Sequence, residues 1–175
     1  MIEQFDSFVE DFLGEKLERP LLIVGASKVD DLLFLIISNY FLPKISGKKD
    51  DLLEGDRPLA TFSSKIKITY RLGIIDRELF KILEQLRAIR NLSAHGIAFD
   101  VKKSPLREHI ATLKKEIKKR RSYELTKIRY FDGLIDSNIK DLQCILVTLC
   151  VVLQAVLAKT IRTTGIEETL KISKK

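Results

Sequence analysis

Residues 76–96 read DRELFKILEQLRAIRNLSAHG, and this segment gives the strongest indication of the fold. Its apolar residues recur every three or four positions, which places them on one face of an amphipathic helix. Asp76 can cap the start of that helix, and Gly96 can end it. The segment therefore predicts a long helix with one buried face. That face consists of Leu79, Ile82, Leu83, Leu86 and Ile89.

The same helical spacing recurs outward in both directions, and no segment shows a sustained alternation of apolar and polar residues. Gly25-Ala26-Ser27 is a run of small residues inside one such segment, so another helix can approach closely there. The sequence predicts an all-α, single-domain helical bundle of about six helices over residues 1–162. The expected helices cover residues 3–13, 20–41, 61–73 and 76–96, a segment from a Ser104-Pro105 cap to a turn at Asp132-Gly133, and a last helix from a Ser137 cap to about Lys159.

The composition fits one globular domain followed by a short tail. The chain has 175 residues, of which 45% are hydrophobic and 31% charged, so a core can form without disulfides. Residues 43–60 are expected to form a loop, and residues 163–175 a polar tail. Cys144 and Cys150 are six positions apart in one apolar run, about 9 Å along a helix, which is too far for a disulfide. We interpret them as small buried residues of a reducing compartment.

Several classes of protein are disfavoured by what the sequence lacks. It has no Cys/His cluster with zinc spacing, no phosphate-binding glycine loop and no nucleophile elbow, so we predict neither a metal nor a cofactor. The first residues lack the layout of a signal peptide. The uncharged run Leu142–Ala158 contains polar residues and is shorter than the usual span of about 20 residues. We interpret this run as a core or dimer helix, and we predict a cytoplasmic protein with no membrane segment.

The positive charge is concentrated in one segment. Residues 102–129 contain eleven Lys/Arg against three acids, a net charge of +8 (11 − 3), whereas the whole chain carries +7. Clustered cations are typical of a surface that binds the phosphate backbone of RNA or DNA. The alternative is a solvated helix face opposite an apolar stripe. No helix-turn-helix is evident. The predicted nucleic-acid-binding residues are Lys114, Lys115, Lys118, Lys119, Arg120 and Arg121.

Two stretches between residues 52 and 75 resemble the mannitol-operon repressor (MtlR) family. The first, residues 52–67, reads LLEGDRPLATFSSKIK and contains the Gly-Asp-x-Pro-Leu turn and the serine-containing helix start of that family. The second, residues 70–75, reads YRLGII. The resemblance extends over roughly residues 20–160 and is strongest in 52–96. It implies an all-helical fold and a regulatory role in bacterial sugar-operon expression, exerted through protein partners or nucleic acid.

A second resemblance lies at the end of the helix that opened this section. Arg90-Asn91-Leu92-Ser93-Ala94-His95 is similar to the Arg-x4–6-His motif of HEPN domains, helical modules that include metal-independent endoribonucleases. A histidine can move protons during RNA cleavage by the 2′-hydroxyl, and an arginine can neutralise charge on the phosphorane. The resemblance makes Arg90, Asn91 and His95 candidate catalytic residues.

The geometry of an ideal helix constrains this motif. Positions five apart lie about 140° from one another, so Arg90 and His95 converge only if the helix loosens or a two-fold axis joins two copies. HEPN relatives use the dimer arrangement, so we predict a homodimer. A structural alternative stays open, in which Arg90 pairs with an acid and His95 helps to end the helix before Gly96.

Two hypotheses on function follow. The first is a bacterial regulatory protein like the mannitol-operon repressor family, which acts through a protein partner or nucleic acid. The second is a HEPN-type ribonuclease, a toxin or defence component, that uses Arg90 and His95. The longer resemblance favours the first hypothesis and the local motif favours the second.

Overall fold

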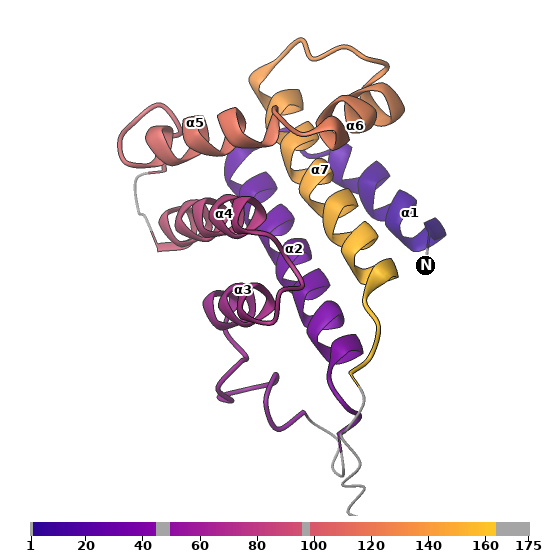
Figure 1. Ribbon diagram of the computed structural model, residues 1–175. Coiled ribbons are helices and arrows are strands. Elements are labelled where there is room, and N and C mark those ends of the chain that lie inside the picture. Colours follow the sequence, from indigo (N-terminus) through magenta and orange to yellow (C-terminus); the bar gives the residue numbers. More distant parts are fainter. Residues whose placement is uncertain (1, 45–49, 96–98, 164–175) are drawn as a thin grey trace, which may run out of the picture.

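The computed structural model describes residues 2–44, 50–95 and 99–163, and these contain seven helices and no strand (Figure 1). The prediction of an all-α single-domain bundle is confirmed. The helices are α1 (Ile2–Leu13), α2 (Glu18–Tyr40), α3 (Phe62–Arg71), α4 (Arg77–His95), α5 (Leu106–Ile117), α6 (Arg121–Phe131) and α7 (Asn138–Lys159).

Helices α2 and α7 form the centre of the bundle and run side by side in the same direction (Figure 1). Their C-terminal ends are joined, because the backbone N–H of Thr163 donates to the carbonyl of Tyr40 at 2.8 Å. The predicted close approach is confirmed at Gly25. A Cβ added there would lie 2.8 Å from Cδ1 of Leu146, so only a glycine lets α7 lie this close to α2.

The remaining helices cover this pair on different sides. Helices α3 and α4 pack against α2, α1 and α6 pack against α7, and α5 lies along α4 and touches α7. The apolar face predicted from residues 76–96 is buried throughout, with Leu79, Ile82, Leu83, Leu86 and Ile89 all in the core.

The predicted caps are confirmed at three of the four helix starts at which one was expected. Thr61 accepts from the backbone N–H of Ser64, Asp76 from that of Leu79, and Ser137 from that of Lys140. The prediction at Ser104-Pro105 is wrong in detail. Pro105 itself occupies the cap position, and α5 begins at Leu106 without a side-chain cap.

The number of helices also differs from the expected six. The predicted segment from Ser104 to Asp132 is two helices, because the backbone becomes extended at Arg120 (φ −85°, ψ 136°). Ile117, at the end of α5, and Tyr123, in the first turn of α6, are both buried, and the break between them lets each helix turn an apolar face inward. The break falls within the basic segment and shapes the site below.

Helix α7 is long and apolar enough to cross a membrane by length and composition alone. Within the described part of the chain, most of its apolar window is buried against other helices. Eleven of its residues are buried, from Asp141 to Cys150 and Leu153. Its apolar character is therefore accounted for by its place in the core, as the sequence predicts for Leu142–Ala158.

The predicted loop and tail are described only in part. Residues 50–60 form turns, in which the Asp50 carboxylate accepts from the backbone N–H groups of Leu52 and Leu53. Residues 45–49 and 164–175 lie outside the described residues, so the prediction of a polar tail stays untested there.

Candidate functional site

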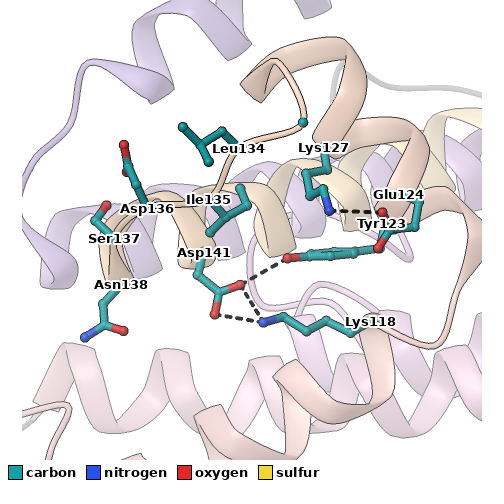
Figure 2. Close-up of a pocket in the computed structure, with 11 residues that line it drawn as sticks. Lys118, Tyr123, Glu124, Lys127, Leu134, Ile135, Asp136, Ser137, Asn138 and Asp141 are labelled. Carbon is teal, nitrogen blue, oxygen red and sulfur yellow. Dashed lines mark hydrogen bonds and ion pairs between the residues drawn. The ribbon is translucent and has the colours of Figure 1, made fainter.

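A polar cleft with a volume of about 830 Å³ opens where the end of α5 and the first two turns of α6 meet the start of α7 (Figure 2). The linker between α6 and α7 forms its outer wall. The cleft is lined by Lys118, Tyr123, Glu124, Lys127, Gly133, Leu134, Ile135, Asp136, Ser137, Asn138 and Asp141.

Local sequence explains the shape of the outer wall. Asp132 (φ 50°) and Gly133 (φ 74°) both adopt the left-handed conformation, which Asp and Gly tolerate better than other residues. They end α6 and reverse the chain, as the sequence predicts for Asp132-Gly133. Ser137 then caps α7. The carboxylate of Asp136 forms an ion pair of 2.8 Å with the ammonium group of Lys140, in the first turn of that helix.

Asp141 lies at the floor of the cleft and accepts from three donors, of which Figure 2 shows Lys118 and Tyr123. Lys114 and Lys118 are one turn apart on α5, so both ammonium groups face the same way, at 3.1 Å and 2.9 Å from the carboxylate. The hydroxyl of Tyr123 donates to the same carboxylate at 3.2 Å. This network joins α5, α6 and α7 at one point.

The charge of the network is set by competing effects. Burial opposes ionisation of Asp141, but the hydrogen bonds and charges of Lys118 and Lys114 outweigh it and hold the pKa of Asp141 below its ordinary value. Burial is the largest cause of the raised pKa of Tyr123, and the neighbouring Cys144 and Asp141 raise it further. Asp141 is therefore ionised and Tyr123 neutral near pH 7, which keeps the donors and the acceptor matched.

Both cysteines of α7 are held in the protonated form, which does not act as a nucleophile. Burial raises the pKa of Cys144 to about 11 and that of Cys150 to about 12, so both stay protonated at neutral pH. Both are free and buried, which confirms the interpretation of them as small core residues.

Four of the six predicted nucleic-acid-binding residues are in ion pairs within the fold. Lys114 and Lys118 pair with Asp141, and Lys119 pairs with Glu116 at 2.8 Å. Arg120 reaches across to Asp76 at the start of α4 at 3.3 Å. Within the described residues only Lys115 and Arg121 of the six are exposed and outside an ion pair.

The candidate catalytic residues lie at the end of α4, and none of them is among the described residues that line the cleft. The Arg90 guanidinium is half-buried and donates to the Asn91 side-chain oxygen at 3.5 Å. The side chain of His95 and residue Gly96 lie outside the described residues, so the structure does not place the third member of the motif.

The surroundings of Arg90 include an acid from another helix. Burial raises the pKa of Asp30 on α2, whereas Lys65, at 2.6 Å, and the charge of Arg90 act in the opposite direction. A second arginine secures the end of α4, because Nε of Arg19 donates to the carbonyl of Ser93 at 2.8 Å. These contacts suit the structural alternative for Arg90, and they leave catalysis untested.

Sequence reasoning missed Asp141, which organises the cleft together with Tyr123. A usable signal was present, since Asp141 is the last charged residue before a run of 17 uncharged residues of one helix. A charge at the edge of a buried helix needs partners in the fold, and the nearest basic helix supplies them. Among the described residues, no group of three or more His, Cys, Asp or Glu side chains is placed to hold a metal ion.

Comparison with known proteins gives a likeness in fold. No protein-family model matches the chain, and no curated protein matches its sequence significantly. A chain in the X-ray structure of the MtlR–HPr complex from Escherichia coli is similar in structure, with a TM-score of 0.53 and 19% sequence identity. The match covers 89% of this chain and 97% of that chain. The fold is therefore MtlR-like, in agreement with the resemblance noted in the sequence, and the HEPN motif gains no support from it.

Proposed function

We propose that this chain is a bacterial regulatory protein of the mannitol-operon-repressor kind that acts by binding a protein partner, and that this partner is an HPr protein. The observation that carries the proposal is the likeness in fold to a chain of the MtlR–HPr complex over nearly the whole of both chains. The family-like turn and helix start at residues 52–67 support it from the sequence.

The cleft offers a contact surface for such a partner. Leu134 stands on its rim with 61% of its surface exposed. Beside it the ammonium group of Lys127 lies 3.2 Å from Glu124, and the side chain of Lys127 is less than one third exposed. The core of a protein interface is apolar and its rim is polar, so Leu134 is placed to be covered by a partner and Lys127 to pair with an acid at the rim. We propose that the partner places an apolar and an acidic side chain here.

Titration calorimetry tests the proposal with the HPr protein of the organism that encodes this chain. Wild-type protein should bind it, and Leu134→Asp combined with Lys127→Glu should weaken binding about tenfold or more. Leu17→Asp, at an equally exposed leucine away from the cleft, should bind as the wild type does. Absence of binding by the wild type would overturn the proposed function. If all variants bound HPr as tightly as the wild type does, only the proposed contact surface at Leu134 and Lys127 would be wrong.

We propose as a second candidate function a metal-independent endoribonuclease that uses Arg90, Asn91 and His95, on the resemblance of residues 90–95 to the HEPN motif. Wild-type protein in excess EDTA should then cut RNA, and Arg90→Ala and His95→Ala should each lower the rate at least a hundredfold. Lys115→Ala, at an exposed lysine away from the motif, is the control. Intact RNA, or cutting by both variants at the wild-type rate, would exclude this candidate.

Binding to nucleic acid without cleavage is the remaining possibility for the basic segment. Because most of the six cations are already paired within the fold, we propose that any such contact depends on Lys115 and Arg121. Two phosphate contacts give a shallow dependence of affinity on salt, whereas six would give a steep one.

A further inference from the structure

Helix α6 is apolar on both of its sides, although only one side packs against the bundle. Tyr123, Thr126 and Phe131 are buried against the rest of the fold. Leu125 and Ile128, on the opposite side, are 56% and 64% exposed. A single exposed leucine is ordinary in a soluble protein, but two large apolar residues one turn apart form a continuous patch. No described residue covers that patch.

The charges along the outward side of α6 are arranged symmetrically about this patch. Arg121 lies at the start of the helix and Asp132 directly after its end, and both are exposed. Neither is in an ion pair with a described residue, whereas Glu124 pairs with Lys127 and Arg129 with Asp6. A cation at one end, an anion at the other and two apolar residues between them make a self-complementary surface.

We infer that the outward face of α6 joins two copies of this chain about a two-fold axis, with Leu125 of one copy packed against Ile128 of the other. When two copies of α6 lie antiparallel, moving along one helix raises the residue number by as much as it lowers the number opposite. If Leu125 of one copy faces Ile128 of the other, Arg121, four positions before Leu125, faces Asp132, four positions after Ile128. The two-fold axis repeats both contacts, which gives two ion pairs around four apolar side chains. Each ion pair lies about 8 Å along the helix from the axis.

A second copy fits this surface better than nucleic acid does. Surfaces that bind nucleic acid carry clustered cations and exposed aromatic rings. Here an acid stands at one end of the face, the centre is aliphatic, and Tyr123 is buried on the far side of the helix. The self-complementary pattern also selects a copy of the same chain over an unrelated protein, because both halves of each contact are present on one face.

The position of the inferred dimer interface has a consequence for the candidate catalytic residues at the end of α4. In Figure 1, α6 and the C-terminal end of α4 lie on opposite sides of the bundle. A two-fold axis at α6 therefore does not bring the Arg90 residues of two copies together. The inferred dimer does not rest on the proposed binding of HPr, although both surfaces use α6, and it differs from the dimer that a composite ribonuclease site needs.

Light scattering coupled to gel filtration, over a range of protein concentrations, tests the inference. The wild type should have twice the mass of the 20.1 kDa chain. Leu125→Asp combined with Ile128→Asp should give a monomer. Leu17→Asp, a comparably exposed position far from α6 in sequence, should remain a dimer. Circular dichroism of each variant verifies that the helices are retained.

Charge reversal separates the specific pairing from general apolar association. Arg121→Asp and Asp132→Arg alone should each weaken the dimer several-fold, and the two together should restore it. A monomeric wild type, or a dimer that survives the Leu125→Asp and Ile128→Asp changes, overturns the inference. A monomer that binds an RNA duplex through Arg121 would overturn it in favour of nucleic acid.

Discussion

Replacement of Gly25 by leucine should lower the free energy of unfolding by about 2–3 kcal/mol. A Cβ at this position would meet three atoms of Leu146, the nearest at 2.8 Å. Leu146 is fully buried on α7, so it has little room to move aside. The added side chain must therefore push α2 and α7 apart along the largest helix contact in the bundle. The loss exceeds the gain in helix propensity of roughly 1 kcal/mol that leucine brings over glycine.

Urea denaturation followed by circular dichroism measures this effect. Ser27→Leu is the matched control, because Ser27 is two residues further along α2 and exposed. It should leave the unfolding free energy within about 0.5 kcal/mol of the wild-type value. Combining Gly25→Leu with Leu146→Ala should cost less than the sum of the two single changes, since the smaller side chain makes room for the leucine. Strict additivity would show that the two residues are not in contact.

Replacement of Asp141 by alanine should destabilise the protein by about 3 kcal/mol. The carboxylate is the shared acceptor of Lys114, Lys118 and Tyr123, and only 8% of the residue is exposed. Without it two ammonium groups on adjacent turns of α5 face each other, and a buried hydroxyl loses its partner. Lys118 is almost half exposed, so water can solvate its ammonium group in the variant. The expected loss of unfolding free energy therefore lies at the lower end of the range for a buried ion pair.

The stabilisation that Asp141 provides should decrease as the pH falls. The folded state holds the pKa of Asp141 below its ordinary value, so its contribution is full above the unfolded pKa of about 4. The contribution disappears as the pH falls through the lower folded pKa. The difference in unfolding free energy between wild type and Asp141→Ala should therefore be constant at neutral pH and shrink in acid. A difference that grows in acid would contradict the assignment.

Asp136→Ala is the matched control for Asp141. Asp136 also pairs with a lysine at 2.8 Å, but half of its side chain is exposed. Water can replace an exposed pair at little cost, so this variant should unfold close to the wild type. If both variants lost stability equally, burial of the Asp141 network would not be the cause of its effect.

The sequence by itself determined the helices and most of their ends. Periodic apolar residues and capping side chains act over three or four positions, so they can be read from neighbours along the chain. The buried face of α4, the caps at Thr61 and Asp76, and the small residues at Gly25 all followed from such local patterns. The resemblance of residues 52–67 to the MtlR family also indicated the fold to which the structure is similar.

Only the tertiary structure decided what the charged residues do. Counting charges along residues 102–129 suggested an open basic surface, but several of its cations pair with acids that lie elsewhere in the chain. Lys118 meets Asp141 across 23 residues, and Arg120 meets Asp76 across 44. The break between α5 and α6 likewise depends on burying Ile117 and Tyr123 at once. Such contacts arise from packing, which brings distant residues together, and no local pattern in the sequence records them.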